Sequence, residues 1–333
     1  MLTFAQFGAG RIGAVHAANL ASSDVTRLRY VIDVNPTAAA ALAGKYGAQM
    51  ADTATALGDP AVDAVIIASS TDTHADLVVA AAKAGKAIFC EKPIDLSLKR
   101  VDVCLAAVRR AKVPMLVGFN RRFDPDFSTL RQRINQGAIG MVEQVIISSR
   151  DPGLPPIAYL KVSGGQFHDM TIHDFDMARW LLGEEPVEVF AYGSCLVDPA
   201  VARVGDTDSV MVLMKTASGK LCHINNSRRA TYGYDQRIEV HGAKGRLMAG
   251  NRIASTVELA DSAAVSTGKP VYFFLERYAD AYKAELAAFV EAVTKKQPVP
   301  VGAEDGRQAI VLAEAAARSL RTGRPVKVAS RRR

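Results

Sequence analysis

The spacing of apolar and polar residues divides the chain into two parts with different rhythms. Over the first 120 residues, short apolar runs alternate with alanine-rich segments of helical spacing. The apolar runs predict strands at 3–8, 28–33, 62–69, 87–91 and 115–119. The segments between them predict helices at 11–21, 36–46, 73–84 and 98–112. Strands that alternate with helices of this length indicate a parallel, doubly wound sheet of the Rossmann type.

Beyond about residue 124, strand-like runs follow one another with short turns, at 142–149, 187–192, 209–216, 220–226, 237–240 and 256–259. Ala217-Ser218-Gly219 predicts a hairpin turn between two of them. Helices are expected at about 166–182, 276–295 and 304–321. The fold class is therefore α/β, with a parallel sheet in a domain at 1–120 and an α+β domain with a largely antiparallel open sheet at 121–333.

Composition narrows the class of protein. The 333 residues contain no apolar stretch long enough to cross a membrane and no recognisable leader, so we expect a cytoplasmic protein with no membrane partner. The four cysteines form no C-x-x-C pair, and we expect them to be free thiols, neither disulfides nor metal ligands. The net charge of +7 comes without a nucleic-acid reader motif, so we expect no nucleic-acid partner.

The strongest motif lies where the first strand meets the first helix. Gly8, Gly10 and Gly13 form a G-x-G-x-x-G loop in the strand–loop–helix context that dinucleotide binding requires. The first glycine allows a tight turn, the second lets the backbone approach a pyrophosphate, and the third lets helix and strand pack closely. The helix start at Arg11 and Ile12 offers N–H groups to phosphates. The alternative is a glycine-rich turn without a ligand.

Asp33 ends the second predicted strand, 20 residues after Gly13. A carboxylate there accepts hydrogen bonds from the adenosine ribose and repels a 2′-phosphate, so the sequence favours NAD over NADP. The alternative is that Asp33 caps the helix that begins at Pro36.

Polar residues also follow the strands at 62–69 and 87–91. Ser69, Thr71 and His74 would line the cofactor crevice, because parallel strands bind ligands at their carboxyl ends. Thr73 as a helix N-cap and His74 as a surface residue are the alternatives. Glu91 and Lys92 would face the same crevice, and Pro93 makes Lys92 extended and permits a cis bond. A surface lysine in a turn is the alternative for Lys92.

A second constellation lies in the predicted helix at 166–182. Asp169 and His173 stand at i and i+4, where they share a helix face, and Ile172, Phe175, Ala178 and Leu182 form its apolar stripe. A histidine beside a carboxylate is a general base suited to removing a hydroxyl proton near neutral pH. A structural helix and a metal site are the alternatives, and we expect no metal, because His168 and His173 are on different faces.

Together, the glycine loop, Glu91-Lys92-Pro93 and the Asp169…His173 helix resemble the glucose–fructose oxidoreductase/inositol dehydrogenase (Gfo/Idh/MocA) family. The similarity spans nearly the whole chain, including residues 118–124, and is greatest to the bacterial inositol dehydrogenases. The resemblance implies Lys92, Asp169 and His173 as catalytic residues. It implies Arg122, Asp151 and Tyr232, beside the catalytic three, as residues that contact a polyol substrate.

The resemblance also implies an activity: NAD-dependent oxidation of a secondary alcohol of a cyclitol or sugar, first of all myo-inositol to 2-keto-myo-inositol. Another inositol isomer, or an aldose such as galactose or glucose, is the alternative substrate. A non-enzymatic NAD-binding regulator of the same fold is a further alternative. Family members commonly form dimers or tetramers through the second domain's sheet, so the resemblance implies a homo-oligomer, with a homotetramer expected.

Overall fold

The structure is a computed structural model that describes residues 1–328, and it divides into two compact units. The first comprises Met1–Asn120 and Ala281–Ile310, and the second comprises Arg121–Asp280 and the residues from Val311 onward. The sequence analysis placed all of 121–333 in the second domain. Residues 281–310 instead pack with the first unit, because Phe289 buries its ring against Phe4 and Phe89, at centroid distances of 6.2 and 5.7 Å.

The first unit is built on a six-stranded parallel sheet in the order β3-β2-β1-β4-β5-β6. The strands are β1 (Leu2–Phe7), β2 (Thr26–Ile32), β3 (Gln49–Met50), β4 (Ala64–Ile67), β5 (Ala87–Glu91) and β6 (Met115–Gly118). Every residue of β4 and β5 is buried, which explains their unbroken apolar runs. The predicted parallel sheet is confirmed, and its strand order reverses between β1 and β4.

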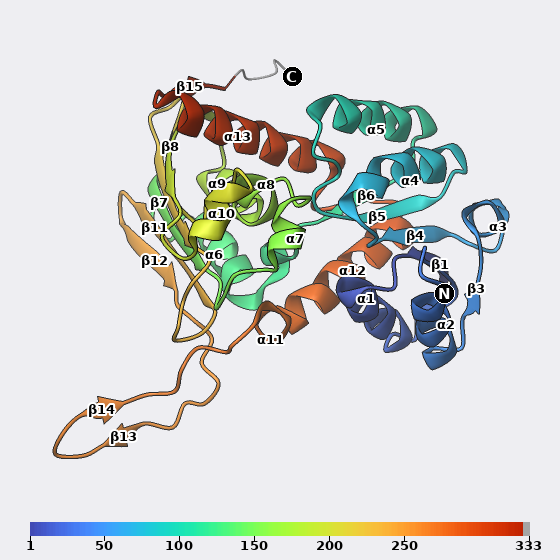
Figure 1. Ribbon diagram of the computed structural model, residues 1–333, viewed down its shortest axis with the longest axis horizontal. Helices are drawn as coiled ribbons and strands as arrows, with labels where there is room; N and C mark the ends of the chain where they lie inside the picture. The colour runs from blue at the N-terminus through green and yellow to red at the C-terminus, as the bar shows by residue number, and fades with distance from the viewer. Residues whose placement is uncertain (329–333) are drawn as a thin grey trace. The chain divides into compact units, whose positions relative to one another are not determined.

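Helices cover both faces of this sheet. They are α1 (Arg11–Ala21), α2 (Pro36–Lys45), α3 (Thr53–Gly58), α4 (Thr71–Lys83), α5 (Leu98–Ala111) and α12 (Ala279–Lys295). The rings of His16 in α1 and Tyr282 in α12 lie 5.9 Å apart, so these two helices share a face. Figure 1 shows α4 and α5 on the opposite side. The sequence analysis missed β3 and α3, which are too short to show a period.

The second unit is built on a seven-stranded sheet in the order β12-β11-β7-β10-β9-β8-β15. The strands are β7 (Val142–Arg150), β8 (Pro186–Ser194), β9 (Ser209–Thr216), β10 (Leu221–Ser227), β11 (Asp235–Gly242), β12 (Gly245–Ala249) and β15 (Val326–Lys327). Every neighbouring pair is antiparallel except β7 and β10. The predicted hairpin turn is confirmed, with Gly219 at φ +96°.

One predicted strand of this unit is wrong. Residues 256–258 pair with nothing among the described residues, and only Leu259–Ala260 (β13) forms a ladder, with Val265–Ser266 (β14). These strands form a separate two-stranded arm (Figure 1). The apolar side chains of Val257, Leu259 and Val265 are exposed there, so the run that resembled a buried strand has no core to enter.

The helices of the second unit lie beside its sheet, and the last begins in the first unit. They are η1 (Asn120–Phe123), α6 (Pro125–Asn135), α7 (Ile157–Leu160), α8 (Gln166–Asp169), α9 (Thr171–Leu182), α10 (Pro199–Arg203), α11 (Phe274–Arg277) and α13 (Ala303–Thr322). The helix predicted at 166–182 is confirmed at both ends, but it is interrupted at Met170, between α8 and α9. The Thr171 hydroxyl at the start of α9 donates to Asn226 of β10 at 2.6 Å. The predicted helix at 276–295 is likewise interrupted at Tyr278.

The apolar stripe of α9 is confirmed, since the side chains that the sequence assigned to it are all buried: Ile172, Phe175, Ala178 and Leu182. Within residues 1–328, no helix has the length and apolar character that crossing a membrane requires.

Candidate active site

The glycine loop of the first unit is shaped by close backbone contacts. Gly8 has φ +103°, and a Cβ atom there would lie 2.3 Å from the Ala68 carbonyl oxygen. A Cβ on Gly13 would lie 2.2 Å from the Gly8 carbonyl oxygen. A Cβ on Gly10 would meet no heavy atom within 4 Å. Gly8 and Gly13 are therefore required by packing, whereas Gly10 leaves open space at the start of α1, which no side chain caps.

Asp33 joins the end of β2 to this loop. Its Oδ2 accepts a hydrogen bond from the Ala9 N–H at 2.7 Å, and its Oδ1 accepts one from the Asn35 N–H at 2.8 Å. The side chain of Asn35, and not that of Asp33, caps α2 by accepting from two N–H groups of its first turn. The alternative of Asp33 as the helix cap is therefore wrong, and its carboxylate is held beside the glycine loop.

The residues after β4 and β5 are tied together by His74. This histidine is 2 % exposed, so the alternative of a surface residue is wrong. Its Nδ1 lies 2.8 Å from the Pro93 carbonyl oxygen and its Nε2 lies 3.1 Å from that of Ser69. Because its ring is held between two loops, His74 orders this edge of the sheet. Helix α4 begins at Thr71, so Thr73 is not its N-cap.

The Glu91-Lys92-Pro93 segment leaves the carboxyl end of β5. Glu91 is buried, and its Oε1 lies 2.7 Å from Nε2 of His16. Lys92 is half-buried, and the Lys92–Pro93 peptide bond is cis, as the sequence permitted. The first unit thus brings together Gly8, Asp33, Ser69 and Glu91 on neighbouring strand ends of one sheet.

In the second unit, two donors hold the carboxylate of Asp169. The Tyr159 hydroxyl donates to Oδ1 at 2.8 Å, and the Arg228 guanidinium donates to Oδ2 at 3.1 Å. Arg228 is 1 % exposed, and its Nε also donates to Gln166 at 2.7 Å. Asp169 ends α8, and the half-buried His173 follows in the first turn of α9.

Asp151 follows β7 and is affected by the same charges. Loss of solvent raises the pKa of its carboxyl group to about 6, with a further increase from the charge of Asp169. The Arg228 guanidinium opposes this increase. Asp151 therefore titrates close to neutral pH, well above the range of an ordinary surface carboxylate.

The two remaining predicted substrate contacts are committed to protein partners. The Tyr232 hydroxyl donates to Asp235 at 2.6 Å, and the tyrosine remains 41 % exposed. Arg122 is buried, and its guanidinium donates two hydrogen bonds to Asp176, at 2.8 and 2.5 Å. Their contacts with a polyol stay predictions.

Comparison with known proteins agrees with this geometry. Residues 2–119 match the family model described as "Oxidoreductase family, NAD-binding Rossmann fold", and residues 131–328 match its "C-terminal alpha/beta domain". The chain belongs to the Gfo/Idh/MocA oxidoreductase family. It is 51 % identical to an inositol 2-dehydrogenase of Rhizobium meliloti over 98 % of this chain and 99 % of that protein.

Solved structures of two inositol dehydrogenases have the same fold. A myo-inositol dehydrogenase from Corynebacterium glutamicum matches with a TM-score of 0.95 and 40 % identity, over 99 % of this chain and 100 % of that one. A scyllo-inositol dehydrogenase from Lactobacillus casei, solved with NAD(H) and scyllo-inositol, matches with a TM-score of 0.92 and 28 % identity, over 99 % and 100 % of the two chains. The N-terminal domain of this family member is an NAD-binding Rossmann fold.

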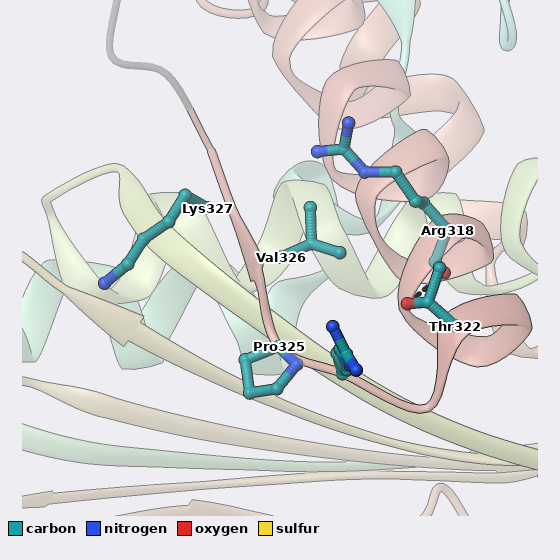
Figure 2. A pocket seen from close by; sticks show the side chains of 6 residues that line it. Arg318, Thr322, Pro325, Val326 and Lys327 are labelled. Atoms are coloured by element: carbon teal, nitrogen blue, oxygen red, sulfur yellow. Dashed lines mark hydrogen bonds between the residues drawn. The ribbon is translucent and has the colours of Figure 1, made fainter.

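The first unit fits that cofactor. Gly10 leaves room for a pyrophosphate at the start of α1, and the Asp33 carboxylate is fixed beside the loop. The sequence analysis missed Tyr159 and Arg228, which orient Asp169, because neither lies in a periodic element or a motif. A shallow pocket beside the end of α13 and β15 (Figure 2) contains none of the predicted site residues.

Proposed function

We propose that this chain is an NAD-dependent dehydrogenase that oxidises myo-inositol to 2-keto-myo-inositol (scyllo-inosose). The observation that carries this proposal is the 51 % identity, over nearly the full length of both chains, to a protein named inositol 2-dehydrogenase. The presence of Lys92, Asp169 and His173 supports an enzyme rather than a regulator. The four cysteines are free thiols, which suits the cytoplasmic location that we propose.

The cofactor's chemistry is acceptance of a hydride from the carbon that bears the reacting hydroxyl. We propose that the N–H groups after Gly10 bind the pyrophosphate, and that Asp33 accepts hydrogen bonds from the adenosine ribose. Ser69, Thr71 and Glu91 line the same strand ends, and His74 positions the loops that carry them.

Three residues are proposed to handle the reacting hydroxyl. His173 removes its proton, which assigns the imidazole as general base. Lys92 stabilises the alkoxide as negative charge develops on oxygen, or relays the proton. Asp169 orients the imidazole or accepts a hydrogen bond from a neighbouring hydroxyl, and its fixation by Tyr159 and Arg228 lowers the entropic cost of either role. Arg122, Asp151 and Tyr232 are proposed to contact other hydroxyls of the polyol.

We further propose that copies of this chain pair through the open face of the second unit's sheet. One cross-strand row on that face joins Phe190, Leu213, His223, Ile146, Glu239 and Met248. Leu213 and Met248 are 55 and 61 % exposed, and Tyr192 and Met211 add to the apolar surface. Exposed apolar surface of this extent is typical of an interface. A Leu213→Lys variant should reduce the mass measured by light scattering, and an unchanged mass would contradict this assignment.

A substrate panel tests the proposed activity. NAD and NADP reduction would be followed with myo-inositol, scyllo-inositol, other inositol isomers, galactose and glucose. We expect the highest kcat/KM for myo-inositol with NAD. A higher kcat/KM for an aldose would assign that aldose as the substrate in place of myo-inositol. Binding of NAD without turnover of any polyol would favour a regulator.

A further inference from the structure

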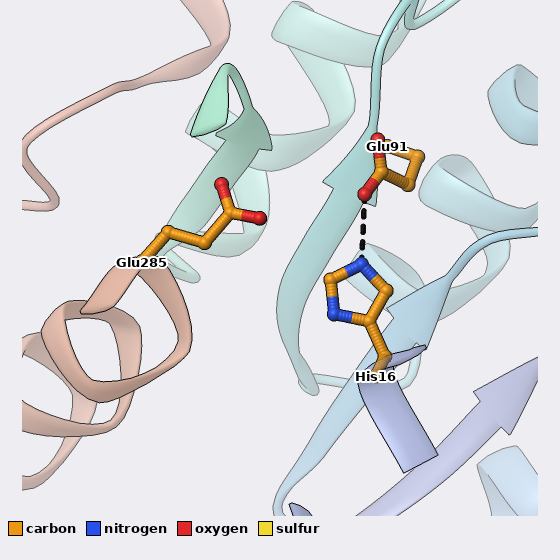
Figure 3. Close-up of side chains that lie close together, drawn as sticks. All are labelled: His16, Glu91 and Glu285. Atoms are coloured by element: carbon orange, nitrogen blue, oxygen red, sulfur yellow. Dashed lines mark hydrogen bonds and ion pairs between the residues drawn. The ribbon is translucent and has the colours of Figure 1, made fainter. Parts of the chain in front are cut away.

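A buried cluster of three ionisable side chains includes Glu91, the first residue of the Glu91-Lys92-Pro93 segment (Figure 3). His16 comes from α1, Glu91 from the end of β5 and Glu285 from α12, and one ligand atom of each lies within 4.8 Å of the other two. All three residues are buried, and Glu285 is 0 % exposed. Among the described residues, neither carboxyl oxygen of Glu285 has a hydrogen-bond partner. Figure 3 shows its carboxyl group directed toward the other two side chains.

An ionised Glu285 in this position would be costly, because a buried carboxylate needs a counter-charge or hydrogen-bond donors. Among the described residues, no hydrogen-bond donor lies within reach of the Glu285 carboxyl oxygens. His16 presents Nε2 to Glu91 at 2.7 Å, and the Phe89 and Tyr282 rings flank the imidazole at 4.9 and 5.9 Å. A Glu91 carboxylate has the same sign as an ionised Glu285 and repels it. Burial and this charge together raise the pKa of Glu285 well above its ordinary value.

A divalent metal ion would also neutralise two carboxylates and a histidine, but the geometry favours a proton. Two ligands of one zinc ion at bond lengths near 2.1 Å stand about 3 Å or more apart. The 2.7 Å distance between His16 Nε2 and Glu91 Oε1 is that of a hydrogen bond. The Glu91 carboxyl group occupies the space that a side chain at Gly118 would take, since a Cβ built there would lie 2.9 Å from Glu91 Oε2.

We propose that Glu285 is held as a neutral acid whose proton is shared with Glu91 through one bridging water. On its other side, Glu91 is hydrogen-bonded to Nε2 of His16, and Lys92 follows Glu91 in the chain. Glu91 is then fixed from one side by this cluster, and the Pro93 carbonyl is fixed from the other by His74. Glu285 and His16 are thereby positioning residues for Lys92. Only this last role rests on the proposed function.

The proton is testable through stability, independently of activity. Because the pKa of Glu285 is higher in the folded state, folding takes up a proton at any pH between the unfolded-state pKa of about 4.3 and the folded-state pKa. Stability is therefore lost as pH rises through this window. Glu285→Gln keeps a donor for Glu91 and removes the titration. The ratio of the wild-type to the Glu285→Gln unfolding constant should rise by up to tenfold per pH unit above pH 5.

Glu291→Gln is the matched control, because this exposed carboxylate on the same helix pairs with Lys295 at 2.6 Å, which lowers its pKa. The ratio of the wild-type to the Glu291→Gln unfolding constant should not change with pH above pH 5. For the positioning role, Glu285→Leu should lower kcat about tenfold with unchanged affinity for NAD, and Glu285→Gln should restore most of the loss. A flat ratio for Glu285→Gln, or a stoichiometric metal ion in the purified protein, would overturn the shared proton. A normal kcat for Glu285→Leu would overturn the positioning role alone.

Discussion

The two units hold their candidate site residues by different means. In the first unit, backbone atoms determine the glycine loop and its neighbour Asp33: Gly8 and Gly13 approach other backbone atoms too closely to accept a Cβ, and Asp33 is fixed by two N–H groups. In the second unit the side chains of Tyr159 and Arg228 fix Asp169. Substitutions in the first unit should therefore act through space and charge at the loop. Substitutions in the second should act through lost hydrogen bonds.

The largest effect is expected for the second unit's proposed base. His173→Ala should lower kcat about 100- to 10,000-fold, the usual contribution of a general base, while NAD binding stays within about twofold. Steady-state kinetics and calorimetric titration of NAD measure the two quantities. His241→Ala, an exposed histidine on β11, is the control and should be near normal. Equal loss of NAD affinity and kcat in His173→Ala would contradict the division of roles.

The charge at the end of β2 should decide the cofactor. Asp33→Ala should lower the preference for NAD over NADP about 10- to 100-fold, because repulsion of the 2′-phosphate is lost. The ratio of kcat/KM for the two cofactors measures this change. Asn35→Ala is the control: loss of the α2 cap should cost about 1 kcal/mol of stability and leave the preference alone. An unchanged preference in Asp33→Ala would remove Asp33 from the cofactor site.

Two glycines of one loop should separate binding from stability. Gly10→Ala meets open space, so its free energy of unfolding should change little, while a methyl group at the phosphate site weakens NAD binding about tenfold. Gly13→Ala meets the Gly8 carbonyl and should cost about 1–3 kcal/mol of stability. Chemical denaturation and NAD titration distinguish the two. Destabilisation by Gly10→Ala with normal NAD affinity would indicate a turn without a ligand.

The hydrogen bond from Tyr159 should have a smaller effect. Tyr159→Phe removes the tyrosine hydroxyl that donates to Asp169, and a bond of about 1 kcal/mol corresponds to about a fivefold lower kcat/KM for the polyol. NAD affinity should not change. Tyr272→Phe alters an exposed tyrosine between β14 and α11 and is the control. Normal kcat/KM in Tyr159→Phe would mean that Arg228 suffices to orient Asp169.

The smallest effect concerns pH. Because the pKa of Asp151 is raised to about 6, its carboxylate form is present above that pH and is lost below it. A carboxylate accepts a hydrogen bond more strongly than the neutral acid does, so KM for the polyol should fall about two- to threefold as pH rises from 5 to 7. Asp151→Asn should lack this step. The same step in Asp151→Asn would assign the titration to another group.

The contrast between the units also explains what the sequence could predict. The parallel sheet and its glycine loop follow from periodicity and from a motif whose spacing is local, and both are confirmed. The interruption at Met170 was not predicted, and the hydrogen bond of the adjacent Thr171 to Asn226, 55 residues further along the chain, is one that no local pattern reveals. Arg228 was missed for the same reason, since its partner Asp169 lies 59 residues away, and so was Glu285, whose neighbours come from distant segments. Tyr159 lies only ten residues from Asp169 and was missed because it belongs to no periodic element or motif. Helix α6 was also missed, although the sequence carries a local signal for it: Asp124 is its N-cap and Pro125 is its first residue.

The most direct test of the proposed reaction uses myo-inositol carrying deuterium at C2. If the chain oxidises that carbon by hydride transfer, the deuterium should appear in the reduced nicotinamide. The rate of the chemical step should also fall. Mass spectrometry of the cofactor and NMR of the ketone product measure both. Deuterium retained in the oxidised product, with unlabelled NADH formed, would show that another carbon is oxidised and would contradict the assignment.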